Sequence, residues 1–234
     1  MNPIKPILLA ALLLSGCQAF QDESRRSKIA RFAVKHPIAA AAIGVETEQS
    51  TNITTNAVRF ALRTGLDNKK NGEGRGTQVN AVRHALWQAA ITSQFDESTA
   101  EEIGNAYEND TELREGKTDY FSRLAADQAV DLRNNRIGRS IGGSKPKSDM
   151  KTLAQAVLQH YRDDGLWTAR EEKSGNRRTW RISQTKLSEQ EYRSALQNLE
   201  PLNQNGMTEQ EQAKKATEAP SEIKETIKVL REKY

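Results

Sequence analysis

The stretch NAVRHALWQ, residues 80–88, is the most informative part of the sequence for predicting the fold. Its polar members recur at the i, i+3, i+4 and i+7 spacing of a helix and share one face: Asn80, Arg83, His84 and Trp87. The positions beside that face are apolar, so the pattern predicts a buried helix with a polar stripe. Buried polar groups need partners, because leaving one unpaired costs roughly 1–3 kcal/mol.

Candidate partners for this stripe follow on two further stretches with helical spacing. The first stretch, 98–108, ends in Glu108, and the second, 120–135, places Asp127, Asp131 and Asn135 four residues apart. An imidazole and several carboxylates suit a divalent metal such as Zn, Mn or Fe. They suit acid–base chemistry equally well, with His84 as the base and a carboxylate that sets its tautomer. No cofactor is therefore assigned, and a divalent metal stays open.

Two roles follow for these residues if they form a site. The catalytic candidates are His84, Glu108, Asp131 and Asp127, and the ligand-binding candidates, which include two arginines for an anionic group, are Arg83, Asn135 and Arg139. The alternative is structural. His84 is then a core histidine bonded to Asp131 or to a backbone carbonyl, and Arg83 and Asp131 form a buried pair that sets helix register.

The rest of the chain extends the same pattern into a mainly α fold, a single bundle-like domain over residues 28–200 with one small β-hairpin. Further helices are expected over 56–66, 149–161 and 188–199, and glycines 138, 142 and 143 are expected to close the helix over 120–135. The hairpin is expected near 166–182. A turn at Ser174-Gly175 would set Trp167 opposite Ile182 and Ala169 opposite Trp180. Residues 201–234 are predicted to form a charged C-terminal helix or tail.

The N-terminus has the pattern of an export signal. Lys5 precedes the apolar run ILLAALLL, residues 7–14, which is shorter than the ~20 residues that span a bilayer and has signal-peptide length. The run ends in LSGC, residues 14–17, which resembles the lipobox of bacterial lipoproteins. That resemblance implies a signal peptide over 1–16, lipid on Cys17, and a lipidated tether over 17–27. Gln18, where retained lipoproteins carry Asp, implies the outer membrane.

The charge balance bears on partners. The chain has 35 basic and 31 acidic residues and a net charge of +4. Such a small excess indicates a solvated surface of mixed charge and argues against nucleic acid as a partner. The expected partners are the membrane, through the lipid anchor, and an envelope component or protein.

Three motifs together resemble an uncharacterised family: NAVRHALW (80–87), IGNAYE (103–108) and DLRNNRIGR (131–139). Members occur in bacterial envelope proteins and at the C-termini of polymorphic toxins, and the resemblance covers about residues 36–143. Members often have His-Glu where this chain has Tyr107-Glu108, so one possible metal ligand is replaced. No reaction is established for the family, and the resemblance implies no catalytic residue.

Two functions are compatible with these patterns. The first is a membrane-anchored, periplasm-facing envelope lipoprotein with a binding or structural role. The second is a hydrolase of an envelope component, peptidoglycan or phospholipid, that uses a His/carboxylate site in a helical core. They differ in what His84 does, because a catalytic histidine faces a cavity and a structural one is enclosed.

Overall fold

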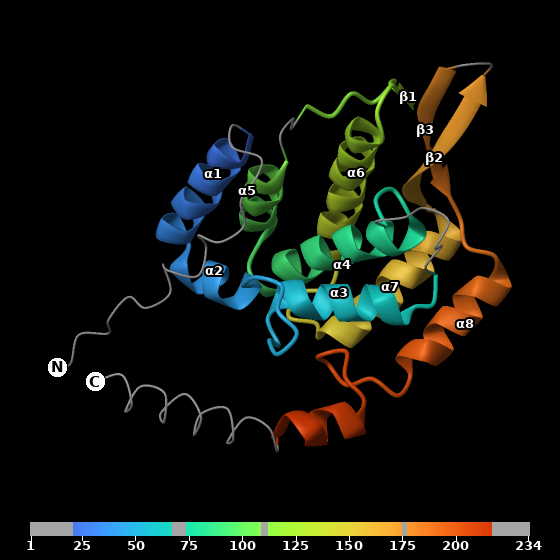
Figure 1. The fold of residues 1–234 in the computed structure, drawn as a ribbon. Coiled ribbons are helices and arrows are strands. Elements are labelled where there is room, and N and C mark those ends of the chain that lie inside the picture. The colour runs from blue at the N-terminus through green and yellow to red at the C-terminus, as the bar shows by residue number, and fades with distance from the viewer. Residues whose placement is uncertain (1–20, 67–73, 109–111, 175–176, 217–234) are drawn as a thin grey trace, which may run out of the picture.

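The computed structural model describes residues 21–66, 74–108, 112–174 and 177–216 (Figure 1). The prediction of a mainly α domain with a small hairpin is confirmed. The elements are α1 Gln21–Lys35, α2 Pro37–Ile43, α3 Ile53–Arg63, α4 Gln78–Gln94, α5 Glu97–Tyr107, β1 Asp119–Tyr120, α6 Arg123–Gly143, α7 Met150–Asp163, β2 Leu166–Ser174, β3 Arg177–Thr185 and α8 Glu189–Leu199. The predicted signal peptide 1–16 and Cys17 lie outside the described residues.

Helix α4, which contains the deciding stretch, is the centre of the fold. It contacts α3, α5, α6, α7 and β2, and it is buried along most of its length, as its apolar composition predicts. The Thr77 side-chain oxygen caps the helix by accepting a hydrogen bond from the backbone N–H of Asn80 at 3.2 Å, so the helix begins before Asn80. The apolar core gathers around it, with fully buried side chains from four helices: Phe60, Leu86, Ile91, Leu153, Leu158 and Leu199.

Helix α6 is longer than predicted because its glycines are packing residues. The expectation that glycines close the helix is wrong for Gly138 and Gly142, since α6 continues through both, whereas Gly143 is its last residue. A Cβ on Gly138 would collide with the Ala85 carbonyl oxygen, and one on Gly142 would collide with that of Ala89. The glycines therefore let the α4 and α6 backbones approach closely.

The sheet has three antiparallel strands in the order β1-β3-β2. The predicted hairpin is present, but its predicted register is wrong: Ala169 pairs with Ile182, and Trp167 pairs with Gln184. The strands end at Ser174 and resume at Arg177, one residue later than a Ser174-Gly175 turn requires, and moving a turn by one residue shifts every cross-strand pair by two. The shift keeps the same face inward, so Ala169 and Ile182 still pack under the sheet.

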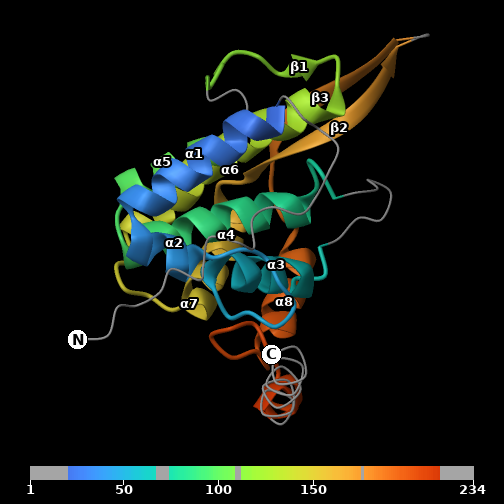
Figure 2. The ribbon, with the colours of Figure 1, turned by 60° about the vertical axis from the view of Figure 1, so that its left-hand side comes forward.

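The two ends of the described chain are helical. The chain is already helical from Gln21, inside the segment 17–27 that the sequence assigns to a tether, because α1 packs along α5 (Figure 2). At the other end, within the predicted tail 201–234, residues 209–216 form a helix. Among the described residues, no helix combines the length and the apolar character that crossing a membrane requires.

Candidate active site

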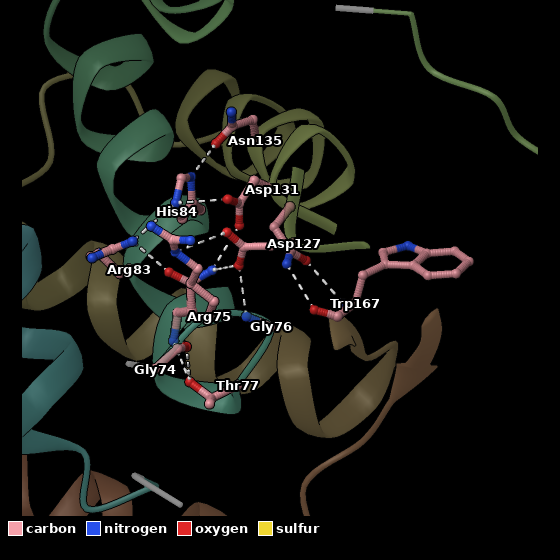
Figure 3. A network of polar contacts seen from close by, with 12 residues as sticks. Gly74, Arg75, Gly76, Thr77, Arg83, His84, Asp127, Asp131, Asn135 and Trp167 are labelled. Carbon is pink, nitrogen blue, oxygen red and sulfur yellow. Dashed lines mark hydrogen bonds and ion pairs between the residues drawn. The ribbon is translucent and has the colours of Figure 1, made fainter. Parts of the chain in front are cut away.

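Polar side chains of α4 and α6 interlock where the two helices approach. The side-chain Nδ2 of Asn80 donates hydrogen bonds to Asp131 Oδ1 at 2.8 Å and to Asp127 Oδ1 at 3.2 Å. One turn further along α4, His84 Nδ1 lies 3.2 Å from Asn135 Oδ1, and its Nε2 lies 3.4 Å from Asp131 Oδ2 (Figure 3). The spacing of four residues on both helices thus aligns the predicted polar stripe with the predicted acids.

The hydrogen bonds of His84 define its tautomer. Arg83 Nη2 lies 3.3 Å from Nε2, and because a guanidinium only donates, Nε2 is the acceptor. Nδ1 carries the proton and donates it to the Asn135 side-chain oxygen. Burial, followed by the charge of Arg83, lowers the pKa of His84 to about 3. His84 is therefore neutral at physiological pH, and its Nε2 lone pair is directed toward Arg83 and Asp131.

Three carboxyl groups surround this imidazole, and each has a raised pKa. Burial, followed by the charge of Asp127, raises the pKa of Glu108 to about 7. Burial and the charges of Asp127 and Glu108 raise the pKa of Asp131 well above its ordinary value. Burial likewise raises the pKa of Asp127, against the hydrogen bond from the Gly76 amide. Close carboxyl groups in a buried site oppose one another's ionisation.

Glu108 differs from the other two carboxyls because its interactions among the described residues are electrostatic only: the charges of Arg25, Arg83 and Lys28 act on it. It is the residue after α5, and its backbone oxygen accepts from Lys28 Nζ at 3.3 Å. Within the described part of the chain, its side chain makes no hydrogen bond or ion pair. One oxygen of Glu108, one oxygen of Asp131 and one ring nitrogen of His84 lie within 4.8 Å of one another.

Asp127 is held in place by the loop before α4. The Gly76 amide donates to Asp127 Oδ1 at 2.7 Å, and Arg75 Nε lies 4.0 Å from Asp127 Oδ2. Only glycine fits at position 76, where φ is +70° and an added Cβ would lie 2.7 Å from the Ala169 Cβ. The glycine-rich composition of this loop was visible in the sequence, but its contact with Asp127 was not.

A cavity of about 200 Å³ opens beside the cluster. His84, Glu108 and Arg83 line it on the polar side, and the remaining wall is mostly apolar, formed by Ala57, Val58, Trp87 and Tyr107. The Trp87 and Tyr107 rings meet edge to face, with centroids 5.5 Å apart. Tyr107 stands where members of the resembled family often have a histidine, and in this chain it forms part of the cavity wall. Apolar pockets with a few convergent polar groups are the usual form of small-molecule sites.

The structure brings together six of the seven predicted site residues of the domain: His84, Glu108, Asp131, Asp127, Arg83 and Asn135. The exception is Arg139, which donates to Gln88 Oε1 at 3.2 Å and lies 3.6 Å from Glu101, away from the cavity. The proposed Arg83–Asp131 pair is also absent among the described residues, since Arg83 bonds to Asn80 and His84 instead.

Fold and site together define a mainly α protein in which a neutral histidine and three carboxyls with raised pKa values meet beside a mostly apolar cavity. The chain belongs to the family described as Domain of unknown function (DUF6973), whose model matches residues 30–165. That range contains every residue of the cluster and ends before the hairpin and α8. Neither the curated proteins nor the solved structures contain a match to the chain.

Proposed function

We propose that this chain is a lipid-anchored hydrolase of an envelope component. The observation that carries the proposal is the carboxyl of Glu108, which makes no hydrogen bond or ion pair within the described chain and faces a neutral histidine and a second carboxyl at the polar side of a cavity. A structural cluster saturates its own hydrogen bonds, because buried unpaired groups destabilise a fold. A group that is left unpaired beside a cavity is instead available to a substrate.

The protonation states in the cluster suit hydrolysis at neutral pH. Glu108, with a pKa raised to about 7, exchanges its proton at that pH and can accept one from water and return one to a leaving group. The raised pKa of Asp131 favours its protonated form, which can donate to the Nε2 lone pair of His84. Arg83, which lines the same cavity, supplies a positive charge for an oxyanion or phosphate.

The walls of the cavity favour phospholipid over peptidoglycan as the substrate. Trp87, Tyr107, Ala57 and Val58 offer hydrocarbon and aromatic surface, which matches an acyl chain better than a sugar. A lipid anchor on Cys17 would hold the domain at the membrane that contains such a substrate. Helix α1, which begins four residues after Cys17, exposes two basic residues suited to an anionic lipid surface, Arg26 and Arg31.

The proposal is tested by incubating the purified full-length chain with vesicles of phosphatidylethanolamine and phosphatidylglycerol, and separately with peptidoglycan sacculi. We expect free fatty acid from the vesicles. His84→Ala is expected to lower the rate by about 100-fold or more. His160→Ala is the matched control, since His160 pairs with Asp164 at 3.1 Å on α7 and should leave the rate unchanged.

Three other outcomes decide between the alternatives. Release of soluble fragments from sacculi alone would keep the hydrolase and change its substrate to peptidoglycan. No product from either material above the His84→Ala background would refute catalysis. Binding of the chain to vesicles or sacculi without product would then favour the non-catalytic role of an envelope lipoprotein.

A further inference from the structure

The cluster beside the cavity has the donor types and the spacing of a metal site. We propose that His84, Glu108 and Asp131 bind one divalent transition-metal ion, with Zn²⁺ as the best match. The inference rests on the proposed function for its biological role and revises one part of it. With an ion bound, Glu108 and Asp131 are deprotonated ligands rather than proton carriers. An imidazole nitrogen and two carboxylate oxygens are a common ligand set for catalytic zinc, which keeps a further position open.

The distances agree with such an ion. The Zn–N and Zn–O bonds in proteins are about 2.1 Å, so two ligand atoms of a tetrahedral ion lie about 3.4 Å apart. His84 Nε2 and Asp131 Oδ2 are 3.4 Å apart. The donor atoms of all three residues lie within 4.8 Å of one another, so the Glu108 oxygen must move closer to complete the set.

The surrounding hydrogen bonds direct the required lone pairs toward this point. A metal-bound histidine usually donates its other ring N–H to an oxygen, and His84 Nδ1 does so to Asn135 Oδ1 at 3.2 Å. Asn80 binds Asp131 through Oδ1 at 2.8 Å and leaves Oδ2 for the ion. The side-chain amides of Asn80 and Asn135 therefore hold the Asp131 carboxyl and the His84 ring in the orientation that an ion would need.

Glu108 supplies the independent observation. Its partly buried carboxyl lines the cavity and makes no hydrogen bond or ion pair among the described residues, so it is available to a ligand. It also lies close enough to Asp127 for the two charges to oppose each other. A dication would neutralise this repulsion, which otherwise requires bound protons.

Arg83 occupies part of the position that the ion would take. Its Nη2 lies 3.3 Å from His84 Nε2 and so competes for the same lone pair. Arg83 lines the cavity, so its long side chain has space into which it can turn when an ion binds. The presence of a guanidinium here shows that the cluster favours a positive charge at this point.

The test is calorimetric titration of the full-length chain, stripped of metal by a chelator, with Zn²⁺ alone at pH 7.5. We expect one ion per chain. Glu108→Gln is the key variant, because its carboxyl supports no other residue, and it should weaken Zn²⁺ binding by about tenfold or more. Glu46→Gln is the matched control: Glu46 lines the same cavity but lies outside the cluster, and binding should not change.

His84→Ala should also abolish the tight site, with thermal melting to confirm that the variant is folded, and His160→Ala should retain it. Absence of one-to-one binding, or equal affinity in the wild type and Glu108→Gln, would overturn the metal site. Hydrolysis that persists in EDTA by a chain that binds no Zn²⁺ would remove this inference and leave the proposed function. Zn²⁺ binding with the expected variant pattern but no hydrolysis would refute the function and leave the metal site.

Discussion

At the scale of single residues, burial rather than residue type sets the chemistry of the cluster. His84 and His160 are the same side chain, but His84 is buried beside Arg83, which lowers its pKa to about 3, whereas His160 pairs with Asp164 at the partly exposed end of α7. The sequence predicted His84, Glu108 and Asp131 as partners from spacing alone. It could not predict that Glu108 would be the member without a side-chain hydrogen bond in the described part of the chain, because pairing depends on side chains from other helices.

Glu108→Gln is expected to stabilise the fold at high pH. The pKa of Glu108 is raised to about 7 in the folded chain from an ordinary 4.5, so ionisation costs stability as pH rises from about 4.5 to 7, and the full loss persists above 7. Glutamine carries no charge at any pH. The variant should therefore unfold with a free energy about 1–3 kcal/mol higher than the wild type at pH 8.

Urea denaturation at pH 4 and pH 8 measures this effect. At pH 4 both folded and unfolded Glu108 are largely protonated, so wild type and variant should differ little. A gain in stability together with a loss of activity is the expected signature of a functional residue. If Glu108→Gln instead lowers stability at pH 8, the carboxyl has a structural partner and the raised pKa is wrong.

At the scale of elements, two small-residue faces hold the site together. Gly138 and Gly142 on α6 lie against the carbonyls of Ala85 and Ala89 on α4. This close approach is what brings Asn80 and His84 within hydrogen-bond distance of the α6 acids. The sequence pattern read these glycines as helix terminators, because glycine is the commonest residue after a helix end and the opposing helix is invisible in a local window.

Gly138→Ala is expected to destabilise the chain by about 1–3 kcal/mol, because the added methyl group overlaps the Ala85 carbonyl and forces the helices apart. Helix propensity alone predicts the opposite sign, a gain of about 1 kcal/mol. Gly143→Ala is the control, because a Cβ at Gly143 meets nothing within 4 Å. Urea unfolding of both variants should give opposite signs, and stabilisation by both would show that α4 and α6 are not in close contact.

The hairpin shows the same limit on sequence reasoning at the level of register. Alternation correctly predicted which side chains of β2 and β3 face inward, because parity decides the face. The pairs themselves were wrong, since Ala169 lies opposite Ile182 rather than Trp180. Turn position decides the pairing, and a run such as KSGN, residues 173–176, allows more than one two-residue turn.

At the scale of the whole molecule, the family match places the site within one contiguous region. Residues 30–165 include α4, α5 and α6 and end just before β2, the first strand of the hairpin. The resemblance predicted over 36–143 lies within this range and is confirmed as membership of the family. Its association with envelope proteins and polymorphic toxins stays a prediction, as does the outer-membrane location.

Lipidation of Cys17 is the prediction that decides location. Cells that express the wild-type chain and are fed labelled palmitate should yield a labelled protein in the membrane fraction. Cys17→Ser should take up no label, because Cys17 is the only cysteine in the chain and the thiol is the acylated group. Equal labelling of both chains would refute the lipoprotein assignment and remove the membrane from the proposed function.

The sequence by itself determined the helical class, the buried α4 stripe and the residue types of the site, because periodicity and composition are local properties that survive without a partner. Only the tertiary structure decided that Arg139 lies away from the cavity and that Gly76 holds Asp127. It also decided that the Glu108 side chain makes no hydrogen bond or ion pair with the other described residues. Those facts depend on how α4, α5 and α6 pack together. Glycines of α6 pack against alanines of α4 that lie far away in the sequence, and a local sequence pattern does not reveal such contacts.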